Sequence, residues 1–451
     1  MENKENEGQL ASSLKTRHIV MLSLGGAIGS GLFMGSSTAI AAAGPAVLLS
    51  YILAGLALYV VMFGVGKMVI HNEKTEVGMS GVIRPYVGSH WAHFTDWTYW
   101  ATWMAVLIAE EAGVTHFLDV LVPINPHLQW IYALIVAILA TGINLYSVKA
   151  FGETEYWLAF IKVAVIIILI VVGLYLLLKN VVTQGVGTAL GAMTSETSFA
   201  PKGFNGFLAS LLVVIFSFGG SELAAVTVAE TANPKVAIPK AIRGVLFRII
   251  SFYVIPIFLF LELLPWKDNS GQNAKAASPF VALFSKIGIP HADTIITIVI
   301  IIAIFSAVNS AIYATSRSLY SRVQGSGDAL SRSLSQLSKK QVPIRAIFLS
   351  SGVLLIGVIL SFVLGDSFWQ FVAGSISFSV SIVWIMLLIA ALRMYFKFPD
   401  TASIFLKVIT VIVTVALTVV FIMQIIQNEW QLSMFALIIV ILSYFSYRKP
   451  R

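Results

Sequence analysis

The sequence is poor in charge and contains no cysteine. Of its 451 residues, 11% are Asp, Glu, Lys or Arg, whereas a soluble domain carries about a quarter. The absence of cysteine excludes disulfides and thiolate metal sites. Hydrophobic residues make up 58% of the chain, so most of its surface must face lipid instead of water. The composition therefore predicts an all-α polytopic membrane protein.

The formal net charge of +8 would suggest a nucleic-acid partner in a soluble chain, but none is expected here. In a membrane chain the distribution of Lys and Arg between alternate loops matters more, because these residues gather on the cytoplasmic side. Most of the 29 Lys and Arg residues fall on the side of the membrane where both termini are expected. Those on the opposite side are Lys179, Lys202, Lys267, Lys275 and Lys286. Both termini, the tails 1–17 and 448–451, are therefore expected in the cytoplasm, with the chain in the cell membrane and without a cleavable signal.

Twelve apolar stretches are each long enough to cross a bilayer as a helix, which takes about 20 residues. They lie at roughly 18–43, 45–70, 92–119, 128–146, 155–178, 206–231, 241–264, 279–321, 345–364, 368–395, 403–427 and 430–447. The eighth is longer than a bilayer requires. Its second half, from about Ser306, is expected to emerge into the cytoplasm.

Glycine interrupts the first and the sixth of these spans. Residues 24–33 read Leu-Gly-Gly-Ala-Ile-Gly-Ser-Gly-Leu-Phe, and residues 216–222 read Phe-Ser-Phe-Gly-Gly-Ser-Glu. Glycine costs about 1 kcal/mol relative to alanine inside a helix, so a plain membrane anchor gains nothing from such clusters. A helix that unwinds at mid-membrane exposes backbone groups to a solute. Two such breaks, five spans apart, predict an inverted 5+5 repeat of 18–178 and 206–395, followed by two accessory helices at 403–447.

The first break offers backbone N–H groups from Ile28 to Gly31 to a carboxylate, and its freed carbonyls suit an ammonium group. A ligand that carries both charges on one carbon, an α-amino acid, fits such a broken helix. A carboxylate without an amine would fit half of it. No nucleotide-binding Gly-x-x-x-x-Gly-Lys-Ser/Thr motif is present, so ATP-driven transport is not expected. The histidines show no metal-ligand spacing, and neither a metal nor a cofactor is expected.

Ionisable residues inside the spans are costly in hydrocarbon and point to function. Glu110 and Glu111 lie in the third span, Lys162 in the fifth, and Glu222 and Glu230 in the sixth. Adjacent residues point about 100° apart on a helix. We therefore expect only one of the paired glutamates to face the interior, while the other finds a polar partner or a more exposed edge.

Lys162 and the two glutamates of the sixth span each allow two interpretations. Lys162 is either a snorkelling lysine whose ammonium reaches the interface, or a buried cation near the first break. In the second case its protonation couples transport to a proton gradient, because burial disfavours the charged form. Glu222 can order the second break, sense the ligand, or do both. Glu230 lies near the cytoplasmic end of its span, where a plain ion pair is an equal alternative.

The chain resembles the bacterial amino acid transporter family of amino acid permeases, within the amino acid–polyamine–organocation superfamily. The resemblance rests on motifs in four spans. These are residues 25–33; residues 216–223 with Ala229-Glu230, Asn233-Pro234 and 238–241; residues 151–157 leading to 161–163; and Ser306, Asn309-Ser310, Tyr313, Ser316-Arg317 and Leu319-Tyr320.

The resemblance implies a leucine-transporter-type fold with 12 transmembrane helices. It implies that Lys162 stands where sodium-driven relatives bind an ion, and that Glu110 matches an acidic position of the third span. The substrate-binding residues expected from the breaks and the resemblance are Ala27, Ile28, Gly29, Ser30, Gly31, Glu110, Ser217, Phe218, Gly219, Gly220, Ser221 and Glu222. The proton-coupling residues expected are Lys162, Glu222 and Glu230.

These observations predict a secondary transporter and not an enzyme. We expect it to import an L-amino acid across the cytoplasmic membrane by proton symport with alternating access. The partners are then a free amino acid, a proton and the lipid bilayer. Two alternatives remain open: an exchanger of one amino acid for another, and a nutrient sensor that binds without transporting. The lack of a long soluble signalling domain argues against the sensor.

Overall fold

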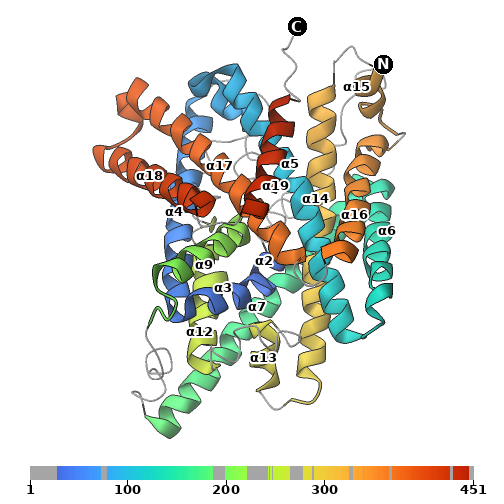
Figure 1. Cartoon of the computed structure of the whole chain (residues 1–451), viewed down its shortest axis with the longest axis vertical. Coiled ribbons are helices and arrows are strands. Elements are labelled where there is room, and N and C mark those ends of the chain that lie inside the picture. Colours follow the sequence, from blue (N-terminus) through green and yellow to red (C-terminus); the bar gives the residue numbers. More distant parts are fainter. Residues whose placement is uncertain are drawn as a thin grey trace. The chain divides into compact units, whose positions relative to one another are not determined.

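A computed structural model gives the fold, which is helical and contains no strand among the described residues (Figure 1). The structure describes residues 28–72, 79–185, 199–220, 242, 244–245, 247–264, 278–286, 289–324, 329–338, 340–364, 368–426 and 430–445. The chain forms two compact units. Unit 1 comprises Met1–Ser30, Trp103–Val163 and Thr297–Val372, and unit 2 comprises Gly31–Thr102, Ala164–Ile296 and Ala373–Arg451.

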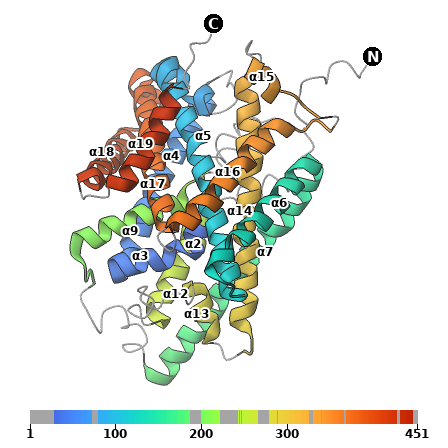
Figure 2. The ribbon, with the colours of Figure 1, turned by 45° about the vertical axis from the view of Figure 1, so that its right-hand side comes forward.

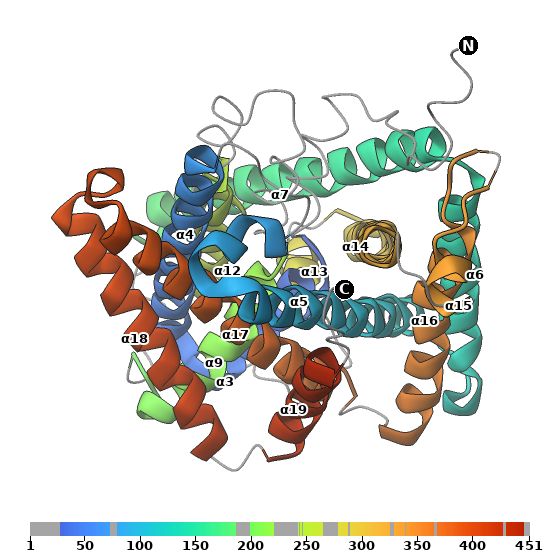
Figure 3. The same ribbon diagram turned by 90° about the horizontal axis from the view of Figure 1, so that it is seen from above.

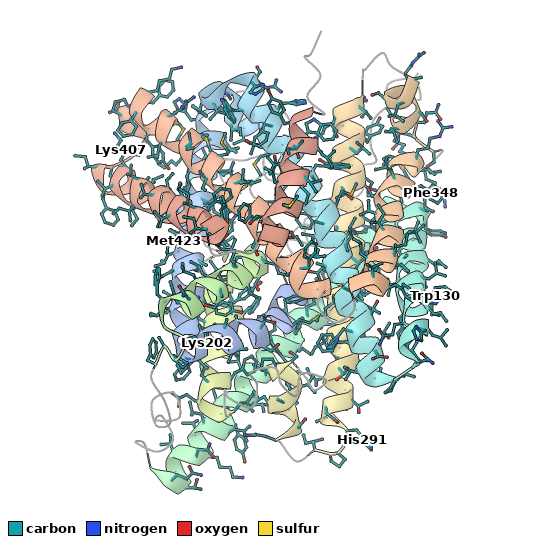
Figure 4. The ribbon with its side chains drawn as sticks, viewed as in Figure 1. Trp130, Lys202, His291, Phe348, Lys407 and Met423 are labelled. Carbon is teal, nitrogen blue, oxygen red and sulfur yellow. The ribbon has the colours of Figure 1, made fainter. Side chains whose placement is uncertain are left out.

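Unit 1 contains one helical pair that presents an apolar face. Helices α6 (Trp130–Tyr146) and α16 (Ile344–Leu364) pack side by side (Figure 2). Trp130 on α6 and Phe348 on α16 are 42% and 57% exposed, and both point outward (Figure 4). Large exposed apolar side chains on neighbouring helices are suited to contact with lipid.

A three-layer stack joins two further helices of unit 1. Phe151 of α7 (Val148–Gln184) stacks on Tyr313 of α14 (Ala292–Val323), with ring centroids 3.9 Å apart and planes 6° apart. On α14 itself, the guanidinium carbon of Arg317 lies 3.4 Å from the Tyr313 ring centroid. Aromatic and cation–π contacts of this kind contribute about 0.5–2 kcal/mol each. The stack therefore fixes the start of α7 against α14, which is seen nearly along its axis in Figure 3.

Unit 2 is organised around α9 (Gly203–Phe218), which packs on α3 (Gly35–Ala43) and α4 (Val47–His71) (Figures 1 and 2). The ammonium of Lys202 (Figure 4) donates to the Ala41 carbonyl across 2.8 Å. Gly206 lies so close to the Ala42 carbonyl that a side chain there would overlap it. These contacts hold the start of α9 against the end of α3.

The remaining helices of unit 2 complete its core and its apolar surface. They are η3 (Ile250–Val254), α12 (Ile255–Leu263), α13 (Pro279–Ser285), most of α17 (Phe368–Lys397), α18 (Ile404–Ile426) and α19 (Trp430–Phe445). The first part of α5 (Met79–Leu121) also belongs to unit 2 and is kinked at Gly88, whose φ of 82° a helix does not tolerate. Its second part belongs to unit 1, as do most of α14 and the start of α7.

Most predicted spans coincide with helices. Within a few residues, 45–70 matches α4, 128–146 matches α6, 345–364 matches α16, 368–395 matches α17, 403–427 matches α18 and 430–447 matches α19. The spans 92–119 and 155–178 lie inside the longer α5 and α7. Five helical stretches are long and apolar enough to cross a membrane among the described residues: 30–71, 151–184, 292–323, 371–397 and 404–426.

The eighth predicted span, 279–321, differs from the structure. It comprises two helices, α13 and α14. Pro290 lies between them and has no N–H to donate, and His291 adopts a φ of 61°, so the chain turns here. Beyond the turn α14 runs unbroken from Ala292 to Val323, and Ser306 is buried inside unit 1. Where this helix leaves the membrane stays a prediction.

Candidate functional site

The first glycine break lies where the described helix begins. Ile28 and Gly29 are not helical, and the helix starts at Ser30 with α2 (Ser30–Phe33). The Ser30 N–H donates to Oε2 of Glu110 across 2.8 Å. The same carboxylate lies against Gly29, where a Cβ would come within 2.6 Å of Glu110 Oε1. The structure thus differs from the expectation that the N–H groups of this break are free, because the protein's own carboxylate occupies one of them.

Lys162 of α7 is completely buried, with 0% of its side chain exposed. The structure therefore favours the buried cation over the snorkelling lysine. Glu110 of α5 and Glu155 of α7 both interact electrostatically with its ammonium. Glu110 is only 4% exposed, and Glu155 is fully buried. Unit 1 thus encloses two carboxyl groups around one amine at the start of the first break.

Glu155 is held by donors from α14. The Ser306 hydroxyl donates to its Oε1, and the Asn309 amide donates to its Oε2 across 3.2 Å. Asn144 of α6 in turn donates to Asn309 Oδ1 across 2.8 Å. All these side chains are buried. A buried network of polar groups is stable only when its members are paired, and this one joins three helices of unit 1.

The second glycine break begins as expected from the sequence. Helix α9 ends at Phe218, Gly219 leaves the helical region, and Gly220 has a φ of 93°, a conformation that favours glycine. The Ser217 hydroxyl on the last turn lies 2.5 Å from the Gly31 carbonyl and 2.9 Å from the Val213 carbonyl. A Cβ on Gly31 would come within 2.8 Å of Ser217 Cα. Within unit 2, Gly31 at the end of the first glycine-rich segment therefore lies beside the last turn of α9.

Three aromatic rings surround the last turn of α9. Phe218 lies edge-on to Tyr51 of α4 and to Tyr253 of η3, with centroid distances of 5.9 and 4.7 Å. The Tyr253 hydroxyl donates to the Ser217 carbonyl across 3.1 Å, which would otherwise lack a partner at a helix end. The sequence marked Ser217 and Phe218 but carried no signal for Tyr51 and Tyr253, since their positions depend on tertiary packing.

The paired glutamates of α5 are both buried, which differs from the expected division between them. Glu111 is 2% exposed, and its oxygens have no hydrogen-bond partner among the described residues. Its carboxylate instead lies directly against Gly357 of α16, where any side chain would overlap it. Close packing against a glycine has removed Glu111 from water without supplying a polar partner.

Several predicted residues lie outside the described part of the chain. They are the substrate-binding candidates Ala27, Ser221 and Glu222 and the proton-coupling candidate Glu230.

Comparison with known proteins decides the family. A model of the amino acid permease family matches residues 18–448. The chain belongs to the amino acid permease family. Over 451 residues it is 67% identical to the aromatic amino acid permease FywP of Lactococcus lactis subsp. cremoris (strain MG1363), which covers 99% of this chain and 98% of that protein.

Two further relatives are more distant from this permease. The uncharacterized amino acid permease YvbW of Bacillus subtilis (strain 168) is 40% identical over 406 residues, which are 90% of this chain and 88% of YvbW. The aromatic amino acid transport protein AroP of Escherichia coli O6:H1 (strain CFT073) is 33% identical over 393 residues, 87% of this chain and 84% of AroP. The family predicted from the motifs is confirmed, and the protein is a multi-pass membrane transporter of amino acids.

The permease also contains a buried acidic residue that sequence reasoning missed. Glu155 lies within the motif 151–157, seven residues before Lys162. Seven residues are close to two helical turns, so the two side chains share a face. An acid and a base on one face of an apolar helix is a signal that could have identified Glu155.

Proposed function

We propose that this permease imports an aromatic L-amino acid together with a proton. The observation that carries the proposal is the buried set of Lys162, Glu110 and Glu155 at the start of the first glycine break. A charged group buried in a membrane protein is costly and is retained where it binds ions, protons or substrate. A proton that binds to this set changes its net charge beside the break, and so links proton binding to the backbone that is proposed to hold the ligand.

The substrate's charged groups are proposed to bind at the two glycine breaks. N–H groups of the segment Ala27–Gly31 hold its carboxylate, and freed carbonyls of the breaks hold its amine. The side of the proposed site that belongs to the sixth span consists of Ser217, Phe218 and the segment 219–222. The contact between Gly31 and Ser217 supports this assignment, because it places Gly31 beside the last turn of α9. Glu222 and Glu230 remain proposed members of the proton pathway.

The aromatic substrate class is supported by the relatives and by the residues beside the second break. FywP and AroP are both described by their names as carriers of aromatic amino acids. The rings of Tyr51, Phe218 and Tyr253 gather around the last turn of α9. Aromatic rings stabilise further rings by edge-to-face contact, worth about 0.5–1.5 kcal/mol per pair.

The proposed topology places both termini in the cytoplasm of the cell, with twelve spans arranged as two inverted repeats of five and two accessory helices. Transport then proceeds by alternating access around the breaks. The bias of Lys and Arg toward the loops on the side of the termini supports this orientation.

An uptake panel in proteoliposomes tests the proposal. Purified permease is reconstituted, and accumulation of labelled Phe, Tyr, Trp, Leu and Lys is measured with and without an imposed pH gradient that is acidic outside. We expect the aromatic amino acids to accumulate only with the gradient, and a protonophore to abolish their accumulation. Uptake that is indifferent to the gradient and requires internal amino acid would instead establish exchange. Empty liposomes are the control.

A further inference from the structure

The hydrogen bonds around Glu155 all run in one direction. Asn144 uses its amide N–H₂ to donate to Asn309 Oδ1, which leaves the Asn309 N–H₂ to donate to Glu155 Oε2. The Ser306 hydroxyl donates to the other carboxylate oxygen. Both oxygens of Glu155 therefore accept from neutral donors, and hydrogen bonds to the charged form favour that form. These hydrogen bonds favour the ionised carboxylate, against the cost of burying its charge.

The helical spacing of Glu155 and Lys162 allows the charge of the lysine to approach Glu155. On a helix, long side chains lean toward the N-terminus, and Glu155 lies on the N-terminal side of Lys162. Seven residues span about 10 Å along the helix axis. A lysine side chain that leans toward the N-terminus brings its ammonium closer to the carboxylate than this spacing. The electrostatic interaction between the two groups agrees with this geometry.

The charges of the three buried groups do not cancel when all of them are ionised. With all three groups ionised, Glu110, Glu155 and Lys162 would leave one uncompensated negative charge in a buried site, which is costly. Among the described residues, the carboxylates that interact with Lys162 include Glu155 on its own helix and Glu110 on α5. Helix α14 faces Glu155 with the neutral side chains of Ser306 and Asn309, and Asn144 of α6 donates to Asn309. Glu155 thus accepts side-chain hydrogen bonds at both oxygens, whereas Glu110 accepts the Ser30 N–H at Oε2.

We propose that Glu155 is a positioning residue for proton coupling, a fixed counter-ion that keeps Lys162 protonated and anchored against α14. Lys162 then presents a constant positive charge, and the proton that enters or leaves is held at Glu110, which contacts the first break through Ser30. This inference rests on the proposed proton coupling and adds to it the residue that sets the pH at which coupling operates.

The test compares Glu155→Gln with Glu155→Asp and with Glu153→Gln, a half-buried carboxylate on the same turn of α7. Initial uptake of labelled phenylalanine is measured in proteoliposomes from external pH 5 to 8, alongside phenylalanine counterflow without a gradient. Glu155→Gln removes the negative charge that is proposed to stabilise the ammonium of Lys162. We expect Glu155→Gln to shift the uptake profile by about one pH unit or more to the acid side while counterflow persists.

The comparison variants make the outcome decisive. Glu155→Asp keeps the charge, and its profile should lie closer to that of the wild type; Glu153→Gln should leave the profile unchanged. A Glu155→Gln profile that superposes on the wild-type profile overturns the inference. So does an equal loss of counterflow in Glu155→Gln and Glu155→Asp with folded protein, which would indicate a structural role alone.

A second variant covers the case in which Glu155→Gln does not fold. Ser306→Ala removes one donor and leaves the carboxylate, so the same acid shift is expected at smaller size, and an unshifted profile overturns the inference. Failure of the proposed function is distinguishable, because in that case the wild type itself shows no uptake that depends on the gradient.

Discussion

The backbone N–H of Ser30 donates a hydrogen bond to Oε2 of Glu110 across 2.8 Å. A side-chain carboxylate of the protein thus occupies a backbone donor that the sequence assigned to the carboxylate of a ligand. Two carboxylates cannot share one N–H with full strength, so the state of Glu110 bears directly on ligand binding.

The first prediction concerns Glu110→Gln. Protonation of Glu110 weakens its bond to Ser30, because bonds to a charged acceptor exceed neutral ones by about 1 kcal/mol, and the freed N–H favours the ligand's carboxylate. Affinity for phenylalanine in the wild type should therefore rise as the pH falls. Glutamine cannot titrate, so ligand-induced thermal stabilisation of the variant should be flat between pH 5.5 and 7.5. A variant that keeps the wild-type pH dependence would contradict the competition between Glu110 and the ligand.

The second prediction concerns Lys162→Ala, with Lys179→Ala as a matched control. Both lysines lie on α7, but Lys162 is completely buried and Lys179 is exposed. Without Lys162, the buried set retains only the carboxyl groups of Glu110 and Glu155, so its net charge no longer responds to pH as it does in the wild type. We expect folded Lys162→Ala protein that has lost accumulation driven by the pH gradient, and a Lys179→Ala variant that behaves as the wild type. Undiminished accumulation by Lys162→Ala would refute the role of this residue in coupling.

The third prediction concerns the contact between the two breaks. A Cβ on Gly31 would come within 2.8 Å of Ser217 Cα, and backbone cannot move aside as a flexible side chain can. Gly31→Ala should lower the melting temperature by an amount equivalent to about 1–3 kcal/mol and abolish uptake. Gly352→Ala is the control, since a Cβ there meets nothing within 4 Å. Equal melting temperatures for the two variants would exclude close approach at Gly31.

The sequence predicted the features that depend on local chemistry. Apolar length located most helices, and the glycines at 31 and 219 marked segments that the structure brings together around Ser217. The features that it did not predict depend on neighbours distant in the chain. Apolar length could not show that Ser306 lies buried against Glu155. The turn at Pro290 was missed although Lys286 and His291 interrupt the apolar stretch on either side of it.

The prediction that only one of Glu110 and Glu111 faces the interior was wrong for a related physical reason. Helical geometry gives the angle between two neighbours but not what each one meets. Gly357 of α16 lets that helix approach closely enough to bury Glu111 as well, and one glycine on another helix is not recognisable from sequence spacing.

The last prediction uses this contact between Glu111 and Gly357. An unpartnered buried carboxyl group costs about 1–3 kcal/mol relative to a group with no polar atoms, so Glu111→Leu should raise the melting temperature in detergent or leave it unchanged. Gly357→Ala should lower it, because the added methyl group overlaps the carboxylate. A double-mutant cycle is made with Glu111→Ala, Gly357→Ala and the double variant. The overlap is gone in the double variant, so the effects of the two single substitutions should be non-additive by about 0.5–3 kcal/mol. Strict additivity would show that the carboxylate does not lie on the glycine. Because Glu110 is untouched in every one of these variants, their uptake should keep the pH dependence of the wild type, which separates a packing role for Glu111 from a role in proton coupling.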